Sequence, residues 1–560
     1  MKKLISLMMI IVSSAIMLTA QTSYDVPVSE EQEKMATGAF EPTWESLKSY
    51  EVPDWFRDAK FGIWAHWGPQ CVEGSGDWMA RELYFEGNSR YEHHVKNYGH
   101  PSEFGFKDIL PLFKAENWDP EALVNFYKDV VGAEYFFVLG NHHDNFDLWD
   151  SKYHEWNSMD IGPKKDILAG WAAAAEKAGL PLGISFHADH AWTWYEPSRR
   201  YDRHGHLAGV NYDGWLTKED GYKLNPDGTE KWWKGLDPQK LYAQNHPLSE
   251  RTWADGAIHS QWGWGNGACP PTQEYVTDFY NRTLDAINRY KPDLIYFDVT
   301  VLPFYPVSDA GMKITAHMYN QPPKPELKSG KEATTSVVFG KILSDDQKKA
   351  LVWDVERGAP NEIMPEPWQC CNCIGNWHYN TEFYENNWYK DAHIVAKLLV
   401  DIVSKNGNML LSVPLRADGT FDEKEEAILR EFGAWMQVNK ESIVATRPWK
   451  VFGEGPIADS DIPINAQGFN DGNYTGAGAD EIRFTQTDNY LYVTALAWPE
   501  DGQITVKSLA KSSPLFKGNI RNLELLGYGK VMFERTAEAL VITLPTEPCN
   551  TLMPVIKIRK

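Results

Sequence analysis

The segment Leu294-Ile295-Tyr296-Phe297-Asp298 places four apolar or aromatic residues directly before one carboxylate. A short run that is apolar on both faces is typical of a buried strand in a parallel sheet. A carboxylate at the carboxyl end of such a strand lies where α/β barrels carry their catalytic groups. The segment therefore predicts a strand over 294–297 and makes Asp298 a candidate catalytic residue.

Five further segments repeat this arrangement of an apolar run followed by polar residues. Stretches with helix-period apolar spacing separate them, and alternating strands and helices form parallel sheets. Because the chain is long and its predicted strands end in polar residues, we expect a closed (β/α)8-like TIM barrel. The one or two remaining strands are expected in the long region 196–271, which otherwise resembles an insertion over the active face. The five further strands are predicted at 60–65, 135–139, 182–186, 350–353 and 408–413, and the helices at 119–131, 164–178, 272–290 and 389–403.

The character of the chain changes after Trp449. A helix over 422–439, with Asp422 as its N-cap, closes the barrel. Short strand-like runs separated by turn residues then replace the helix patterns, which predicts a C-terminal β-sandwich of about 110 residues. We divide the chain into a signal peptide over 1–20, a catalytic barrel over 21–447 and a β-sandwich over 448–560. The strand-like runs are 481–484, 490–497, 503–506, 523–526 and 539–544.

The first residues predict export. Met1-Lys2-Lys3 is basic, residues 4–18 are mostly apolar, and Ala20 is a small residue at the expected cleavage point. No later apolar stretch is long enough to span a bilayer. We therefore expect an exported protein, periplasmic or secreted, without a membrane anchor. The formal net charge of -22 disfavours nucleic acid as a partner.

Aromatic residues make up 13% of the chain, and 24 of them are Trp. The face of a Trp ring packs well on the C–H face of a sugar, so carbohydrate is the first substrate class to consider. A large aromatic core would give the same composition.

The six cysteines do not form a recognisable metal motif. Cys370-Cys371-Asn372-Cys373 lacks the paired C-x-x-C form, and no second cluster accompanies it. Buried thiols or one local disulfide are the expected state of these cysteines, rather than a metal site.

Histidines gather at the ends of the predicted strands. A metal site would need acidic ligands at a regular spacing, and the run His142-His143-Asp144 matches no common site. Imidazole both donates and accepts hydrogen bonds, so binding of sugar hydroxyls is the favoured interpretation. The candidates are His66, His142, His143, His187, His190 and His378.

A glycosidase needs two carboxyl groups. Asp298 is the candidate nucleophile. For the second, Glu356 directly follows a predicted strand, but the neighbouring Arg357 favours an ionised carboxylate rather than a general acid. Glu362 and Glu366 lie farther along, and Glu366 is on a loop that could reach the site from the side.

Many short motifs occur in a fixed order between Trp55 and Trp449. They include Trp55-Phe56-Arg57-Asp58-Ala59-Lys60-Phe61-Gly62-Ile63, His66-Trp67-Gly68, Gly76-Asp77-Trp78, His142-His143-Asp144-Asn145-Phe146, Tyr290-Lys291-Pro292-Asp293 and Lys405-Asn406-Gly407-Asn408. Together they resemble the α-L-fucosidases of glycoside hydrolase family 29, although the third motif is often Gly-Glu-Trp in that family. The resemblance implies a (β/α)8-like barrel with a C-terminal β-sandwich. It also implies a retaining mechanism through a covalent glycosyl-enzyme on the residue that matches Asp298.

The same resemblance implies roles for the residues around that aspartate. His66, His142 and His143 match residues that hold fucose hydroxyls, and Trp78 and Tyr296 match positions that pack the ring or its methyl group. It implies a fucosylated or related L-sugar glycan as the partner, with no metal or organic cofactor. Further substrate-binding candidates in these motifs and at the strand ends are Trp67, Asp77, His187 and Trp377.

One departure from the family pattern concerns the acid/base residue. The family commonly has Glu directly after a Trp, where this chain reads Pro367-Trp368-Gln369. A neutral Gln cannot act as a general acid, so this chain resembles a subgroup with Gln at that position. We favour Glu356 as the replacement, with Glu366 as the alternative.

These patterns predict an exo-acting retaining hydrolase that releases terminal α-L-fucose from glycans. An α-L-galactosidase, or a hydrolase of a related and sulfated algal L-sugar glycan, is the alternative within the same class. A glycan-binding protein with little catalytic activity is the alternative of another class, and Gln369 motivates it.

Overall fold

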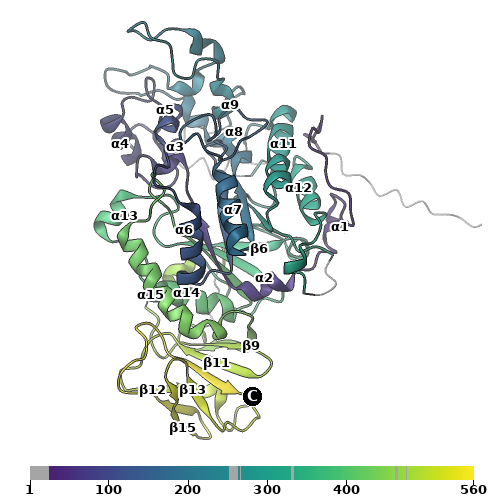
Figure 1. The fold of residues 1–560 in the computed structure, drawn as a ribbon, viewed down its shortest axis with the longest axis vertical. Helices are drawn as coiled ribbons and strands as arrows, with labels where there is room; N and C mark the ends of the chain where they lie inside the picture. The colour runs from purple at the N-terminus through teal and green to yellow at the C-terminus, as the bar shows by residue number, and fades with distance from the viewer. Residues whose placement is uncertain are drawn as a thin grey trace, which may run out of the picture.

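The computed structural model places an α/β body beside a smaller all-β unit that holds the C-terminus (Figure 1). The predicted signal peptide and part of the 196–271 region lie outside the described residues. No helix in the described part of the chain is long and apolar enough to cross a membrane. The described residues are 24–250, 252, 263–264, 267–329, 333–460, 465–474 and 476–560.

Eight parallel strands, hydrogen-bonded in chain order, close into a barrel. This confirms the predicted barrel, and six strands lie at the predicted places. The strands are β1 (Phe61–Ala65), β2 (Tyr135–Asn141), β3 (Leu182–Phe186), β4 (Leu294–Phe297), β5 (Val337–Gly340), β6 (Val352–Glu356), β7 (Trp368–Cys373) and β8 (Gly407–Ser412).

The expectation that the missing strands lie within 196–271 is wrong. They are β5 and β7, which lie farther along the chain. β5 is a short apolar run of the same length as β4, whereas β7 is not an apolar run because it carries Gln369 and Asn372 among its cysteines. Both polar side chains are nevertheless fully buried.

Helices surround the barrel, and α11 shows how they position the site. Its C-terminal residue Tyr290 is followed by Lys291 in the left-handed conformation, with φ of 47°. This turn reverses the chain into β4, which Asp298 directly follows. The helices are α1 (Trp44–Leu47), α2 (Asp54–Ala59), α3 (Met79–Glu82), α4 (Ser89–Asn97), α5 (Phe106–Ile109), α6 (Pro120–Asn125), α7 (Ile167–Ala178), α8 (Ala191–Trp194), α9 (Pro238–Tyr242), α11 (Gln273–Tyr290), α12 (Ala310–Tyr319), α13 (Thr381–Asn386), α14 (Ala392–Ser404) and α15 (Glu423–Asn439).

Aromatic side chains fill the barrel interior where neighbouring strands carry glycine. A Cβ on Gly62 would lie 2.4 Å from the ring of Tyr135, and one on Gly183 would lie 2.4 Å from the ring of Phe137. These glycines therefore leave the space that the rings occupy. Asp422 caps α15 as predicted, because its side chain accepts from two backbone N–H groups of the first turn.

The C-terminal strands form a six-stranded sheet, in the order β14-β13-β17-β11-β10-β9, and a three-stranded sheet, in the order β12-β16-β15. One apolar core contains Phe484 of β10, Ile504 of β12 and Ile542 of β16, so the two sheets pack face to face. The strands are β9 (Arg447–Glu454), β10 (Ile482–Gln486), β11 (Tyr490–Ala495), β12 (Gln503–Val506), β13 (Leu523–Leu525), β14 (Gly529–Lys530), β15 (Met532–Arg535), β16 (Leu540–Thr543) and β17 (Val555–Arg559).

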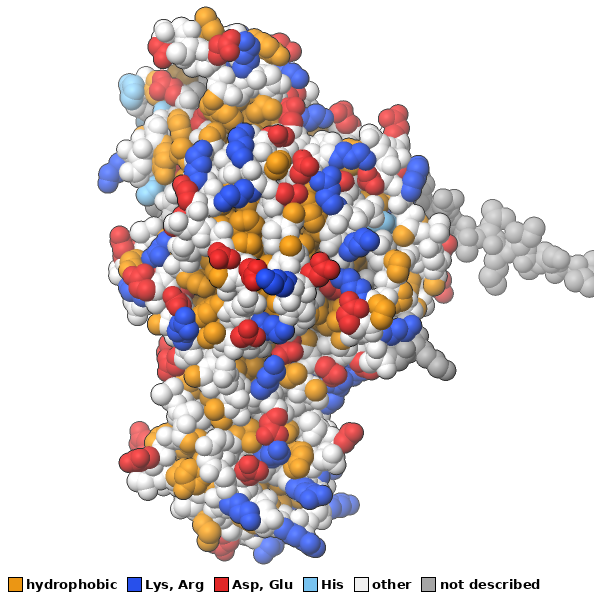
Figure 2. Space-filling model, viewed as in Figure 1, with side chains coloured by type: hydrophobic (Ala, Val, Ile, Leu, Met, Phe, Trp, Pro, Cys, Tyr) orange, Lys and Arg blue, Asp and Glu red, His pale blue; other side chains and the backbone are white. Residues whose placement is uncertain are grey.

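Acidic and basic side chains are interspersed over the face shown in Figure 2, on both the α/β body and the C-terminal sheets. The six cysteines are free thiols, and four of them are buried.

Candidate active site

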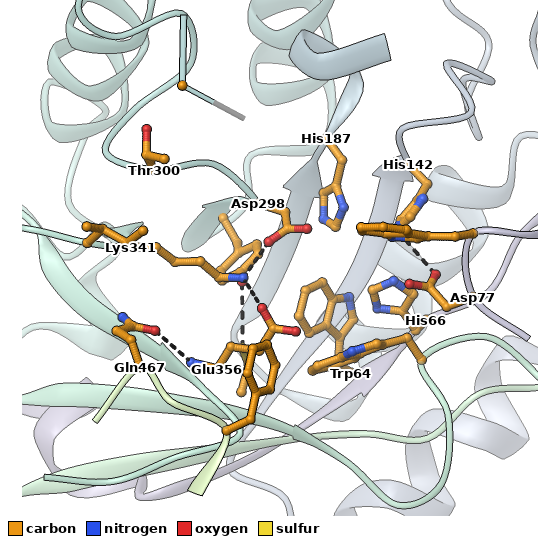
Figure 3. A pocket seen from close by; sticks show the side chains of 17 residues that line it. Trp64, His66, Asp77, His142, His187, Asp298, Thr300, Lys341, Glu356 and Gln467 are labelled. Atoms are coloured by element: carbon orange, nitrogen blue, oxygen red, sulfur yellow. Dashed lines mark hydrogen bonds and ion pairs between the residues drawn. The ribbon is translucent and has the colours of Figure 1, made fainter. Parts of the chain in front are cut away.

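A cavity of about 470 Å³ opens at the carboxyl ends of the barrel strands (Figure 3). Polar groups and aromatic rings share its walls. The lining residues are Trp64, His66, Asp77, Trp78, His142, His187, Gly263, Tyr296, Asp298, Thr300, Lys341, Ile342, Glu356, Cys371, Trp377, Gln467 and Phe469.

Asp298 directly follows β4, and both of its carboxylate oxygens have cationic or polar partners. Oδ1 accepts a hydrogen bond from Lys341 Nζ, and Oδ2 lies 3.1 Å from His143 Nε2. Burial alone would raise the pKa of Asp298, but the Lys341 ammonium and the His143 hydrogen bond together lower it well below its usual value. Asp298 is therefore held as a carboxylate, the form that a nucleophile requires.

His143 is buried between two hydrogen-bond acceptors. Its Nε2 faces Asp298, and its Nδ1 lies 2.9 Å from the carbonyl oxygen of His187. A neutral imidazole has one N–H donor, so both bonds form together only when the ring carries two protons.

Lys341 joins Asp298 to a second carboxylate. Its Nζ lies 2.7 Å from Glu356 Oε2 while it also donates to Asp298. Two oxygens that share one nitrogen are separated by at most two hydrogen-bond lengths, about 6 Å. Retaining glycosidases have carboxyl groups about 5–5.5 Å apart, and inverting ones about 6.5–9.5 Å apart. The spacing of Asp298 and Glu356 fits the retaining arrangement.

Lys341 itself remains charged in this position. Burial favours the neutral amine, but Asp298 and Glu356 together raise the pKa of Lys341 well above its usual value.

The histidines form a polar wall on the other side of the cavity from Lys341 and Glu356 (Figure 3). Asp77 Oδ1 accepts from His378 Nδ1 at 2.7 Å. Both ring nitrogens of His66 and of His187 have no hydrogen-bond partner in the described part of the chain. Burial lowers the pKa of His66, His142 and His187 well below the usual value, so these rings are neutral.

A neutral imidazole presents one donor and one acceptor, which suits the hydroxyl groups of a sugar. The ligand atoms of His66, Asp77, His142 and His378 also lie within 4.8 Å of one another, a spacing that a metal ion could use. We favour sugar hydroxyls over a metal ion as the partners of these groups, because the groups lie beside the same cavity as Asp298.

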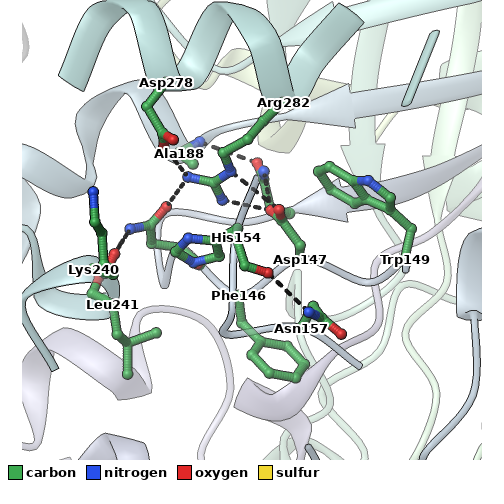
Figure 4. A network of polar contacts seen from close by, with 12 residues as sticks. Phe146, Asp147, Trp149, His154, Asn157, Ala188, Lys240, Leu241, Asp278 and Arg282 are labelled. Atoms are coloured by element: carbon green, nitrogen blue, oxygen red, sulfur yellow. Dashed lines mark hydrogen bonds and ion pairs between the residues drawn. The ribbon is translucent and has the colours of Figure 1, made fainter. Parts of the chain in front are cut away.

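The loop that carries His142 and His143 is fixed from α11 (Figure 4). Arg282 Nε donates to Asp147 Oδ2 at 3.1 Å, and its Nη1 donates to Asn145 Oδ1 at 2.9 Å. Arg282 and Asp147 are both fully buried, so this ion pair lies inside the protein.

The structure brings most of the predicted site residues together. Asp298, Glu356 and three of the predicted histidines line one cavity, and His143 contacts Asp298. His378 bonds to Asp77 beside the cavity, whereas the ring of His190 stacks on Trp264 and is not among the lining residues. The predicted substrate-binding residues that line the cavity are His66, Asp77, Trp78, His142, His187, Tyr296 and Trp377.

Trp67 and Glu366 are exceptions. Trp67 points away from the cavity, where its Nε1 donates to the carbonyl of Arg416 at 2.8 Å and its ring packs on Phe113. Glu366 is exposed and lies two residues before β7, at the end of the barrel opposite the cavity. Glu366 is therefore excluded as the partner of Asp298, because parallel strands place their N-terminal and C-terminal ends at opposite faces of a barrel.

Gln369 also lies away from the cavity. It is the second residue of β7, where its Nε2 donates to Asp354 Oδ1 at 3.0 Å and its Oε1 accepts from the Tyr135 hydroxyl at 3.0 Å. Its amide holds three strands together inside the barrel. A carboxyl group at this position would not reach Asp298, so the interpretation of Gln369 as the acid/base position is corrected.

Sequence reasoning missed Trp64, Lys341, Gln467 and Phe469 among the lining residues. Lys341 follows the apolar run Val337-Val338-Phe339-Gly340, the same signal that identified Asp298, so the sequence did carry a pointer to it. Gln467 and Phe469 come from beyond the barrel, and no motif indicates that they return to it.

Comparison with known proteins agrees with this geometry. The family model for alpha-L-fucosidase matches residues 28–441, and that for the alpha-L-fucosidase C-terminal domain matches residues 477–559. Tissue alpha-L-fucosidase of Rattus norvegicus is 24% identical over 527 residues, covering 92% of this chain and 91% of the relative. Plasma alpha-L-fucosidase of Homo sapiens is 24% identical over 512 residues, covering 88% of this chain and 85% of the relative.

A solved structure of alpha-fucosidase from Thermotoga maritima has the same fold. It covers 93% of this chain and 100% of its own, with a TM-score of 0.63 and 24% identity. The first family model spans well over half of the chain and contains every barrel strand. The chain therefore belongs to the alpha-L-fucosidase family and is a glycoside hydrolase.

Proposed function

We propose that this protein is an exo-acting retaining hydrolase that releases terminal α-L-fucose from glycans. The observation that carries the proposal is the pair Asp298 and Glu356, two carboxylates joined by one lysine at the floor of a single cavity. Family membership makes fucosides the substrate class to expect, and the spacing of the pair favours retention.

In the first step, an oxygen of Asp298 attacks the anomeric carbon and the glycosidic C–O bond breaks. Glu356, in its protonated form, gives its proton to the departing oxygen. That oxygen must then replace Lys341 as a partner of the Glu356 carboxyl group. In the second step, Glu356 takes a proton from water, the water oxygen attacks the anomeric carbon, and Asp298 is released.

The two sides of the cavity suit the two sides of a 6-deoxy sugar. The ring hydroxyls would bond to His66, His142 and His187, whose neutral rings offer both donors and acceptors. The methyl group and the C–H face of the ring would pack on aromatic residues such as Trp64 and Tyr296, whose ring centroids lie 4.9 Å apart.

Neither the glycan-binding protein nor the hydrolase of a related L-sugar is favoured over an α-L-fucosidase. The weakly catalytic glycan-binding protein was motivated by Gln369, which lies inside the barrel and leaves the carboxyl pair intact. No contact described above favours an L-galactoside over a fucoside. We also propose export to the periplasm or the medium, on the basis of the predicted signal peptide over 1–20.

Aryl glycosides test this proposal. The protein should hydrolyse an aryl α-L-fucoside faster than the matching α-L-galactoside, and proton NMR should detect α-L-fucose as the first product. Faster hydrolysis of the galactoside would show that α-L-galactose, rather than α-L-fucose, is the preferred sugar. Initial release of the β-anomer would reject the retaining mechanism.

A further inference from the structure

Two residues of the cavity wall, Gln467 and Phe469, come from the loop between β9 and β10 rather than from the barrel. The part of this loop that carries them lies between the two regions that the family models match, because the first ends at residue 441 and the second begins at residue 477. The family models therefore do not describe the residues that this loop adds to the cavity wall.

The loop residues 465–474 are fastened to the segment that follows β6. Asp471 is buried and forms an ion pair with Arg357, with Oδ2 and Nε 3.2 Å apart, and its backbone N–H donates to the Arg357 carbonyl at 3.1 Å. Asn470 both donates to and accepts from the backbone of Ala359, each at 3.0 Å. This ion pair and these hydrogen bonds fix the position of residues 465–474 against the segment that follows β6.

Gln467 connects the loop to the strand that carries the proposed acid. Its Nε2 donates to the carbonyl of Asp354 at 2.8 Å, and its Oε1 accepts from the backbone N–H of Glu356 at 3.4 Å (Figure 3). The loop therefore lies on the side of the cavity where Glu356 must meet the glycosidic oxygen. The leaving group extends from that oxygen, so it lies on this side as well.

Two apolar side chains are exposed at this side of the cavity. Phe469 is 56% exposed and Ile342, which follows Lys341, is 61% exposed. Both have positive φ, 51° and 48°, which is strained for these residue types. Such strain persists where the surroundings enforce it, often at ligand sites, and exposed apolar groups beside a cavity mark a binding surface.

We propose that Phe469 and Ile342 form the subsite for the leaving group, and that this group is a sugar whose C–H face packs on the Phe469 ring. This inference rests on the proposed function. It makes these two side chains the source of a preference for fucosylated oligosaccharides over fucosides with small leaving groups.

The experiment compares a fucosylated lactose trisaccharide, in its α-1,2 and α-1,3 forms, with α-L-fucosyl fluoride. The fluoride leaving group is one atom and cannot reach Phe469. For Phe469→Ala, the ratio of kcat/KM on the better trisaccharide to kcat/KM on the fluoride should fall about tenfold, and Phe469→Trp should restore it. Tyr528→Ala, which removes an equally exposed aromatic ring from the C-terminal sheets, should leave the ratio unchanged.

A second variant moves the loop without touching Phe469. A Cβ on Gly358 would lie 2.1 Å from the carbonyl oxygen of Ala466, so Gly358→Ala must displace residues 465–474. The same ratio should fall, with KM for the trisaccharide rising more than kcat falls.

An unchanged ratio in Phe469→Ala would overturn the subsite, and so would a wild-type protein that hydrolyses the fluoride but neither trisaccharide. If wild type hydrolyses none of the three compounds, the proposed function itself fails, which is a different result from either of these.

Discussion

The ammonium nitrogen of Lys341 lies 2.7 Å from Oε2 of Glu356. The same nitrogen donates to Asp298, so one cation sets the distance between the two carboxyl groups and neutralises part of their mutual repulsion. Lys341 follows β5, whereas the carboxylates follow β4 and end β6. Three neighbouring strands of the barrel thus bring their ends to one point.

Removal of the Lys341 charge should impair the proposed nucleophile. In wild type the pKa of Asp298 is lowered, so the carboxylate persists as the pH falls. Lys341→Met removes a charge that lowers this pKa, so Asp298 takes up its proton at a higher pH. We expect kcat/KM on an aryl fucoside to fall about 100-fold and the acid limb of its pH profile to move upward.

Lys341→Arg is the conservative control, since it keeps the charge, and Lys240→Met removes an exposed lysine that lies outside the cavity wall. The role assigned to Lys341 would be wrong if the Met variant kept the wild-type acid limb.

The choice of Glu356 over Glu366 can be tested directly. Glu356→Ala should reduce kcat/KM on an aryl fucoside with a poor leaving group about 1,000-fold, because general acid catalysis is lost. On an aryl fucoside with a good leaving group, which departs without an acid, azide should restore turnover of the variant and give a fucosyl azide, because azide attacks the glycosyl-enzyme without a base. Glu366→Ala should behave as wild type, because the side chain is exposed at the other end of the barrel. Equal losses in the two variants would contradict the assignment.

The buried ion pair of Arg282 and Asp147 should contribute strongly to the stability of the protein. Arg282→Met leaves a buried carboxylate without its cation, which costs about 3–5 kcal/mol of unfolding free energy. Urea denaturation measures this loss. Arg430→Met breaks an exposed pair with Glu426 and should cost at most about 0.5 kcal/mol. Similar midpoints for the two variants would show that the buried network does not hold the histidine loop.

The neutral histidines predict a specific loss of stability in acid. Their pKa values are lowered in the folded protein, so below about pH 6.5 the unfolded chain binds protons that the native state does not. Stability therefore falls as the pH drops below that value, and each such histidine contributes about 1.4 kcal/mol per pH unit. In urea titrations at pH 5 to 6, His187→Gln should reduce the dependence of the unfolding free energy on pH by about 1.4 kcal/mol per pH unit. An unchanged slope would mean that His187 is protonated in the native state.

Much of the barrel could be predicted because six of its strands are continuous apolar runs that end in polar residues. β7 is not recognisable as an apolar run because it contains Gln369 and Asn372, whose amides are buried against Tyr135 inside the barrel and Asp471 outside it. A pattern of polar residues in sequence cannot reveal such partners. The family motif around Trp368 predicts Gln369 at the acid/base position, whereas its side chain is part of the core.

The cavity wall was only partly predictable. The histidines and Asp298 end strands and so could be found from local sequence. Gln467 and Phe469 owe their position to the contact of Asp471 with Arg357, which joins residues far apart in the chain. Only the tertiary structure reveals that contact.

The most direct test concerns the covalent bond to Asp298. The protein should be incubated with a 2-deoxy-2-fluoro-α-L-fucosyl fluoride, which forms the glycosyl-enzyme but slows its hydrolysis. Mass spectrometry of the intact protein and of its peptides should then detect one added fluorofucosyl group, located on Asp298 and absent in Asp298→Asn. Label on another residue, or hydrolysis of the fluoride by Asp298→Asn at the wild-type rate, would contradict the account.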